Sequence, residues 1–397
     1  MRDILNKDFI VFLLGLAGFI VTADNWVISP ILPAISESFH ISAASSGLLI
    51  TAYMFPFGAF QIIMGPLSDR YGKKQVLTLS IIIFTITTGL CALGTNLASL
   101  SVFRALTGVF ASSIMPISIA LIGDMFPTQE RQRAISTFMG ISYLGQGLSM
   151  VIGGSVAYFL SWRSVFTVYA IFSLVPTILF IKSYKKIPSV KKPDAELFSP
   201  YLQMISKTEN MFIYIIIFLE GMFIIGSFSY IGAYIEAVHH FNYLKIGLIM
   251  TGFGIMTLLG GRVGSKAVKI TGPKIMVTFG LASGAASDLL MYYAGADVRV
   301  AAAAVALLGL AFILTHSTLM TRITELAQNA RGTAMGLVAF CFMAGGAAGT
   351  AMGGKIVSVY DLNTLFLAFG TALLCSAVLS LLMIKGKAAR KPVLANV

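Results

Sequence analysis

Residues 65–74, GPLSDRYGKK, form a short charged turn between two long apolar runs, 43–66 and 75–94. Each run is close to the roughly 20 apolar residues that a helix needs to cross the hydrocarbon core of a membrane. The same pattern continues in both directions, because apolar runs of this length alternate with charged or turn-rich breaks along the whole chain. The turn and its flanks therefore predict an integral membrane protein built of helical spans.

The composition excludes a soluble protein of ordinary type. Hydrophobic residues make up 57% and charged residues only 11% of the 397 residues, whereas soluble domains carry about 25% charged residues. The net charge of +12 would suggest nucleic-acid binding in a soluble protein. In a membrane protein it follows from the enrichment of Lys and Arg in cytoplasmic loops, so we expect no nucleic-acid partner.

Twelve membrane-spanning helices are expected, and the absence of a period of two argues against a membrane barrel. The expected spans are 9–33, 43–66, 75–94, 98–122, 134–160, 163–183, 210–238, 244–268, 274–294, 299–324, 332–358 and 363–385.

The basic residues predict the orientation. With both termini cytoplasmic, only Arg163, Lys245, Arg299 and Lys355 fall on the outer side, and Arg104 lies within a span. The other basic residues, including Arg262, Lys266, Lys269 and Lys274 around the turn between the eighth and ninth spans, fall on the inner side. This asymmetry predicts a multi-pass protein of the plasma or inner membrane with both termini inside.

The chain is expected to consist of two halves. Residues 184–209 are polar, basic and contain Pro188, Pro193 and Pro200, so we interpret them as a cytoplasmic linker. They separate a six-span half, 1–183, from a second six-span half with a short basic tail, 210–397.

The two halves repeat at an offset of 200 residues. Matching residues are Gly47-Leu48 and Gly247-Leu248, Gly72 and Gly272, Arg131 and Arg331, Gly145 and Gly345, Gly153-Gly154 and Gly353-Gly354, and Phe166 and Phe366. Parallel repeats related by an axis along the membrane normal are typical of transporters whose substrate site lies near the midplane between the halves.

The charged turn resembles the signature loop of the major facilitator superfamily, and the resemblance covers essentially the whole chain. It implies a gating latch that opens as the halves rock, formed by Gly65, Asp69, Arg70, Gly72, Lys73 and Lys74, with Arg131 in the loop before span five. Asp69 is expected near a helix N-terminus and neighbouring arginines. The alternative is a solvated turn that only sets topology. The second-half copy carries Lys269 at the position equivalent to Asp69.

Two further motifs resemble those of drug:proton antiporters. In span one, Asp24 is followed nine residues later by Pro33 of a Leu-Pro pair, and in span four Arg104 stands four residues before Gly108. Span five departs from the antiporter pattern, because Ser149-Met150 replaces the usual Gly-Pro pair. The remaining glycines are expected to pack helices closely; with Gly108 they are Gly145, Gly153 and Gly154.

Ionisable residues inside spans are costly and are functional candidates. At 1.5 Å per residue, Asp24 lies roughly 22 Å from the inner surface and Arg104 roughly 9 Å from the outer one, so the two share a depth and could pair. Glu220 lies roughly 15 Å deep and has no basic neighbour in its own span. We expect these three residues to couple transport to protons. The alternatives are a hydrated Asp24, a structural hub at Arg104 and a structural hydrogen bond at Glu220.

His316 is interpreted as a polar packing residue rather than as part of a relay. By analogy in position, a substrate cavity is expected to be lined by Asn25, Tyr53, Tyr143, Gln146, Met222, Phe223 and Tyr230.

The chain has no phosphate-binding glycine loop ending in Lys-Ser or Lys-Thr and no Cys/His cluster, so we expect no enzyme activity, cofactor or metal site. The sequence therefore predicts proton-coupled efflux of small amphipathic or drug-like compounds by alternating access. Two acids against one arginine would tolerate a cationic substrate. The expected partners are the substrate, protons and membrane lipid, and the protein is expected to be a monomer. Alternatives are a proton-coupled importer or facilitator of a metabolite, a lipid or glycolipid exporter, and a non-transporting sensor.

Overall fold

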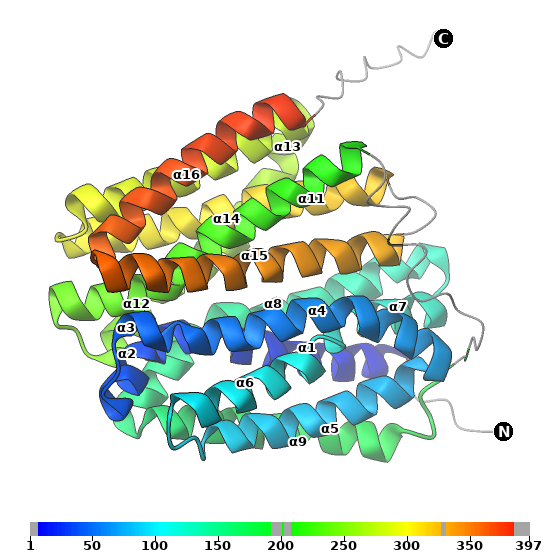
Figure 1. Cartoon of the computed structure of the whole chain (residues 1–397). Helices are drawn as coiled ribbons and strands as arrows, with labels where there is room; N and C mark the ends of the chain where they lie inside the picture. The colour runs from blue at the N-terminus through cyan, green and yellow to red at the C-terminus, as the bar shows by residue number, and fades with distance from the viewer. Residues whose placement is uncertain (1–6, 190, 192–200, 202–207, 327–330, 385–397) are drawn as a thin grey trace, which may run out of the picture.

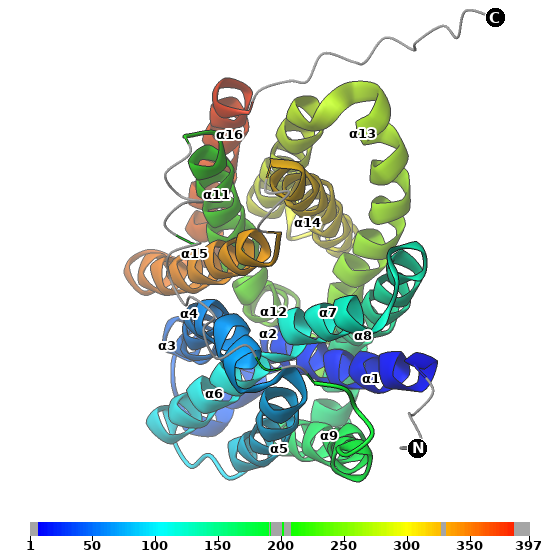
Figure 2. The same ribbon diagram turned by 90° about the vertical axis from the view of Figure 1, so that its right-hand side faces the viewer.

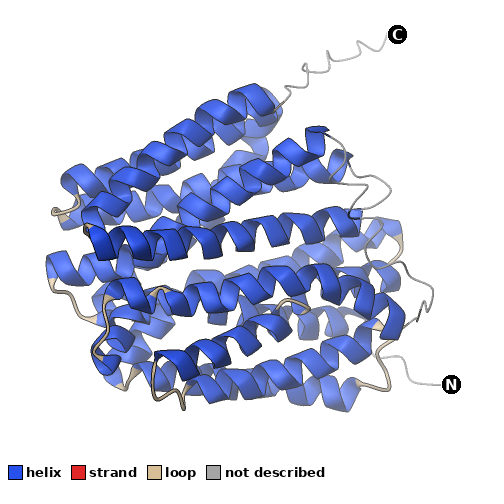
Figure 3. Cartoon of the chain, viewed as in Figure 1, coloured by secondary structure: helices blue, strands red, loops and turns tan. Residues whose placement is uncertain are grey.

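All regular structure described here is helical (Figure 3). The computed structural model describes residues 7–189, 191, 201, 208–326 and 331–384. Most of the expected linker, the basic tail and the side chain of Arg331 lie outside the described residues.

Among the described residues, nine helices belong to the first half and lie together in the lower part of Figure 2. They are α1 (Lys7–Trp26), α2 (Ile28–Phe39), α3 (Ala43–Ser46), α4 (Leu48–Tyr71), α5 (Lys73–Cys91), α6 (Leu97–Ala111), α7 (Ile114–Met125), α8 (Thr128–Phe159) and α9 (Trp162–Ser183).

The second half lies above the first. It comprises α11 (Thr208–Glu220), a π-helical turn η1 (Gly221–Ile225), α12 (Gly226–His239), α13 (Tyr243–Ala294), α14 (Val298–Leu326), α15 (Arg331–Val359) and α16 (Leu362–Met383).

The described helices give twelve spans, as expected. In the part of the chain that the structure describes, eleven helical segments are long and apolar enough to cross a membrane, and the longest, α13, has 52 residues. Its chain folds back at Gly272, where φ is 82°, so α13 supplies two spans. The α1 and α2 helices together form the first span, with a break at Val27. The predicted all-helical fold with two six-helix halves is confirmed.

The repeat at an offset of 200 is visible in the backbone. Positive φ angles occur in the described residues at His40 and His240, which end helices, and at Gly72 and Gly272, which turn the chain between spans. The helix caps repeat as well: Ser42 and Asn242 each accept a hydrogen bond from the backbone N–H three residues on, and so do Ser161 and Asp361. Each half therefore uses the same devices at the same places.

The spans lie side by side along the bundle (Figure 1). We call the end that carries residues 65–74 the basic end, and the end that carries the α2–α3 turn the opposite end. Glycines allow close helix contact: Gly145 and Gly153 of α8 rest on α1 and on Val27, Gly108 of α6 rests on the backbone of Tyr53, and Gly154 meets Gly247 across the two halves.

The halves meet tightly near the opposite end. The Ser29 hydroxyl donates to the carbonyl of Phe228 at 2.8 Å, and the Tyr243 hydroxyl donates to the carboxylate of Glu37 at 2.5 Å. Trp26 packs against Phe228 and Phe253, with ring centroids 5.2 Å away in each case. These contacts join α1 and α2 to α12 and α13, so the interface between the halves is closed there.

Candidate functional site

A buried ion pair joins α1 to α6. Arg104 Nη1 lies 2.8 Å from Asp24 Oδ2, and both side chains are 0% exposed. Asp24 stands three residues before the break between α1 and α2, and Arg104 lies on the buried face of α6 with Leu100 and Gly108. The structure thus brings together the two residues that the sequence placed at one depth.

The pair is only partly satisfied by hydrogen bonds. Asp24 Oδ1 and Arg104 Nε and Nη2 are buried and have no partner among the described residues. The guanidinium carbon of Arg104 lies 4.2 Å from the centroid of the Tyr53 ring, a distance at which a cation is attracted to the ring face. Buried charges are stable only when paired, so a change in the charge of Asp24 would force Arg104 to find other partners.

A second pair joins the end of α11 to α14. His316 Nδ1 lies 3.2 Å from Glu220 Oε2; the Glu220 side chain is 0% exposed and that of His316 is 15% exposed. Glu220 immediately precedes the π-helical turn η1, and such turns often occur at functional sites. His316, interpreted from the sequence as a polar packing residue, thus contacts an intramembrane acid.

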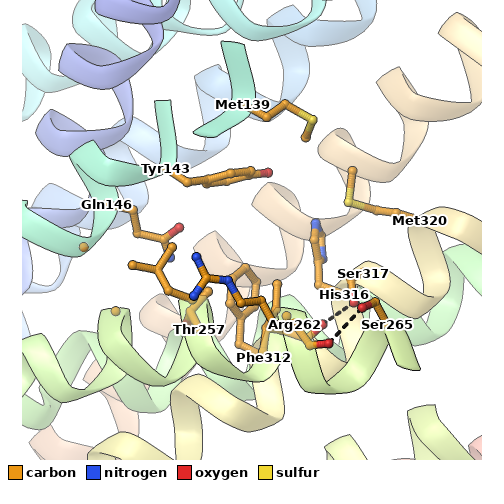
Figure 4. A pocket seen from close by; sticks show the side chains of 15 residues that line it. Met139, Tyr143, Gln146, Thr257, Arg262, Ser265, Phe312, His316, Ser317 and Met320 are labelled. Atoms are coloured by element: carbon orange, nitrogen blue, oxygen red, sulfur yellow. Dashed lines mark hydrogen bonds between the residues drawn. The ribbon is translucent and has the colours of Figure 1, made fainter. Parts of the chain in front are cut away.

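A cavity of about 400 Å³ lies between α8 of the first half and α13 and α14 of the second (Figure 4). Its walls include Met139, Tyr143, Gln146, Thr257, Arg262, Ser265, Phe312, His316, Ser317 and Met320. A smaller space of about 180 Å³ shares Tyr143, Gln146, Phe312 and His316 with it and extends to Asn25 and Trp26 of α1.

The hollow continues towards the basic end. A further space of about 500 Å³ shares Gly261, Ser265 and Ser317 with the central cavity and reaches Lys269 and Arg322. The turn of α13 at Gly272 lies at that end of the bundle (Figure 2). The interface between the halves is therefore hollow towards the basic end and packed near the opposite end.

The predicted cavity residues divide into two groups. Asn25, Tyr143 and Gln146 line the hollow, whereas Tyr53, Met222, Phe223 and Tyr230 are not among the residues described as lining it. These four are held by packing: Tyr53 lies against Arg104, Phe223 packs on Phe369, Met222 lies against Gly345 and Gly349, and the Tyr230 hydroxyl donates to the carbonyl of Thr350. Sequence reasoning missed Arg262, Phe312 and His316.

The charged turn forms a compact ion cluster. Lys73 Nζ lies 3.0 Å from Asp69 Oδ1 and 2.7 Å from Asp124 Oδ2, so it ties α4 and α5 to α7. Gly72 has φ 104°, a conformation that favours glycine. The partner of Asp69 is thus a lysine and not the expected arginine. Arg131 of α8 donates to the carbonyl of Phe126 at 3.4 Å.

The remaining residues of the turn lie at its rim. Arg70 lies 5.9 Å from the Tyr71 ring and Lys74 5.0 Å from the Tyr184 ring, while Gly65 lies close to the Tyr201 hydroxyl. All the groups of the ion cluster belong to the first half.

Comparison with known proteins gives one consistent family. A family model described as Major Facilitator Superfamily matches residues 14–350 and, in a second match, residues 245–396. An uncharacterised transporter of that superfamily from Bacillus subtilis (strain 168), YceJ, is 29% identical over 85% of this chain and 86% of its own length. The multidrug efflux pump LfrA of Mycolicibacterium smegmatis is 29% identical over 49% of this chain and 38% of its own. The crystal structure of the nucleoside transporter NupG superposes with a TM-score of 0.78 at 15% identity, over 96% of this chain and 100% of that one.

Proposed function

The chain belongs to the major facilitator superfamily, and from that premise we propose that it expels small amphipathic compounds in exchange for protons. It is a multi-pass membrane transporter, and transporters of this superfamily are not enzymes. The similarity to a multidrug efflux pump supports the efflux part of the proposal, over about half of the chain.

The observation that carries the proposal is the ion pair of Asp24 and Arg104 within the membrane, near the hollow between the halves. Asp24 immediately precedes Asn25, which lines the hollow. A proton that binds to Asp24 cancels its charge and leaves Arg104 uncompensated, so the pair has two states of very different electrostatic energy. Such a two-state element lets a proton bias the conformation of the helices that hold it.

Glu220 and His316 provide a second place for a proton. Glu220 is buried behind His316, whose side chain lines the cavity. A proton reaching His316 from the cavity has only one hydrogen-bond step to Glu220. Each proton that moves inward across 100 mV supplies about 2.3 kcal/mol.

The arrangement of the halves supports alternating access. They are closed near the opposite end and hollow towards the basic end, and Gly154 and Gly247 allow α8 and α13 to touch closely. With the orientation that the basic residues predict, the hollow opens to the cytoplasm, and rocking of the halves would open the opposite end to the outside.

Proton-coupled import of a metabolite is the second candidate. Its support is the local structure of α8, which runs without a proline through Ser149 and Met150. The Ser149 hydroxyl donates to the carbonyl of Gln146 one turn earlier, so the helix is continuous where antiporters carry a Gly-Pro pair.

Dye accumulation in cells separates the two candidates. Cells that produce the protein should accumulate less of an amphipathic dye than cells without it, and an uncoupler should abolish the difference. Cells that produce the Asp24→Asn variant should accumulate as much dye as cells without the protein. Asp288→Asn is the matched control, because Asp288 is equally buried but accepts its hydrogen bond from Ser227 at 2.6 Å, away from the cavity. Higher accumulation with the protein would favour import and reject efflux.

A further inference from the structure

The charges that face the central cavity differ from the charges buried around it. Asp24 and Glu220 are each 0% exposed, and neither lines the hollow. The basic side chains on the described walls of the central cavity are Arg262 and His316, and no carboxylate is among the residues that line it. The charged groups nearest to a substrate in this cavity are therefore basic. The acids inside the spans, which outnumber Arg104, lie behind the cavity walls.

Arg262 carries the fixed part of that charge. It projects from α13, and in Figure 4 its guanidinium points into the space on the side of Gln146 and Thr257. It has no carboxylate partner within the described residues. An arginine stays protonated at every physiological pH and presents a planar fork that matches a carboxylate. The charge of this wall is thus independent of the protonation of His316.

Gln146 faces the same space, and its side-chain amide does not have a hydrogen-bond partner for every polar atom. Its side chain is only 3% exposed, and its Nε2 group has no hydrogen-bond partner in the part of the chain that the structure describes. A buried amide N–H without an acceptor is costly, and it is a donor that a ligand can satisfy. Arg262 from the second half and Gln146 from the first half therefore offer donors to one acceptor group between them.

Flat apolar surface adjoins these donors. The Phe312 ring lies at a 25° angle to the His316 ring with centroids 5.2 Å apart, and at 24° to the Phe253 ring with centroids 5.7 Å apart. Tyr143 lines the wall formed by α8 (Figure 4). Aromatic rings prefer offset-stacked or edge-to-face partners, so this wall suits a planar organic group.

We propose that the cavity binds a planar amphipathic organic anion. Its carboxylate lies between the Arg262 guanidinium and the Gln146 amide, and its apolar body lies against Phe312 and Tyr143. This inference rests on the proposed transport function and specifies its substrate class. It assigns a negative charge to the substrate, whereas the number of acids in the spans indicated only that a cationic substrate would be tolerated.

Three small probes of nearly one shape test the charge preference: 4-nitrobenzoate, 4-nitrobenzamide and 4-nitrobenzylammonium. The chain has two tryptophans, and Trp162→Phe leaves Trp26, which lines the hollow, as the only fluorescent indole for nitroaromatic quenching. In that background the anion should bind at least tenfold more tightly than the amide and the cation, because charge-assisted hydrogen bonds are about twice as strong as neutral ones.

The variants locate the site. Arg262→Gln should remove the tenfold preference, Arg262→Lys should retain part of it, and Gln146→Glu should weaken the anion and strengthen the cation. Arg299→Gln, in the first turn of α14 and not among the residues that line the cavity, should change nothing. Equal affinities, a preference for the cation, no quenching by any probe, or an unchanged preference in Arg262→Gln would each overturn the proposal.

A separate measurement tests the proposed function. Proteoliposomes with a trapped pH indicator report whether addition of 4-nitrobenzoate moves protons. Anion preference without proton movement would keep the substrate class and reject proton coupling. Proton movement driven only by the cation or the amide would keep coupling and reject the substrate class.

Discussion

His316 of α14 contacts Glu220, at the end of α11, through Nδ1 at 3.2 Å while its ring lines the central cavity. The carboxylate is fully buried, so the histidine is its link to the hollow. The neutral imidazole of His316 and its charged form differ by the proton that such a link would carry. The pair therefore connects an acid inside the second half to the space where substrate is proposed to bind.

Replacing Glu220 by Gln should uncouple transport and leave binding intact. The amide keeps the shape and can still accept a hydrogen bond from His316, but it cannot take up a proton. We expect Glu220→Gln proteoliposomes to lose accumulation of substrate against a gradient while counterflow down a gradient continues. Glu209→Gln is the control, since Glu209 pairs with Arg322 at 2.6 Å outside the central cavity. Retained accumulation against a gradient would remove Glu220 from the coupling mechanism.

The pair of Asp24 and Arg104 should show strong coupling in stability. Removing one member of a buried pair leaves an uncompensated charge and costs about 3 to 5 kcal/mol. Asp24→Asn should therefore lower the free energy of unfolding by roughly that amount, and Asp24→Asn with Arg104→Gln should recover a large part of the loss. Unfolding in mixed micelles at increasing denaturing detergent measures all four members of the cycle.

Asp288→Asn is the matched single variant for this cycle. Its carboxylate is as buried as that of Asp24 but has a serine and not an arginine as its partner, so no buried cation is left behind. Additive effects of the Asp24 and Arg104 variants would show that the pair is not coupled.

The fold was predictable from the sequence because spans and internal repeats are patterns of residues that are local or regularly spaced along the chain. Apolar length gives the twelve spans, and glycines at Gly72 and Gly272 mark turns that the structure shows at both places. The pair of Glu220 and His316 was not predictable in the same way. It joins residues 96 positions apart, and no periodicity within one span reveals its neighbour in another.

The sequence also did not predict whether a given side chain faces the cavity or a neighbouring helix. Arg262 follows an apolar run near the basic end, so it was counted with the loop residues that set orientation, yet its side chain lines the cavity. Tyr53 and Tyr143 are both aromatic residues within spans, but one lies against Arg104 and the other against open space. Only the rotation of each helix about its axis, which packing decides, separates the two cases.

The ion cluster of Lys73 should control rate more than stability. Its acidic partners Asp69 and Asp124 are 41% and 45% exposed, and partly exposed pairs contribute about 1 kcal/mol or less. Asp69→Asn should therefore fold normally and slow transport, and Lys73→Met should slow it further because both acids lose their partner. Initial rates normalised to the amount of folded protein measure the effect.

Lys74→Met serves as the control for this cluster. Lys74 is the next residue in the chain but lies over the Tyr184 ring, so its removal should leave the rate nearly unchanged. A normal rate in Asp69→Asn would reduce the cluster to a solvated turn that sets topology.

The hydrogen bond from Tyr243 to Glu37 should stabilise closure near the opposite end. It joins α13 to α2 at 2.5 Å across the two halves, and a hydrogen bond to a charged group contributes about 1.5 to 3 kcal/mol. Tyr243→Phe removes only the hydroxyl, so the population open at this end should rise about tenfold or more.

The rate of maleimide labelling at one cysteine measures this opening. The cysteine is introduced as Ser29→Cys in a background without Cys91, Cys341 and Cys375, because Ser29 is 2% exposed between the halves. Tyr292→Phe should leave that rate unchanged, because the Tyr292 ring packs on Tyr293 of its own helix and its hydroxyl makes no bond across the halves within the described residues. Equal labelling of Tyr243→Phe and the parent protein would show that this hydrogen bond does not hold the opposite end closed and that other contacts, such as the packing of Trp26, Phe228 and Phe253, do so.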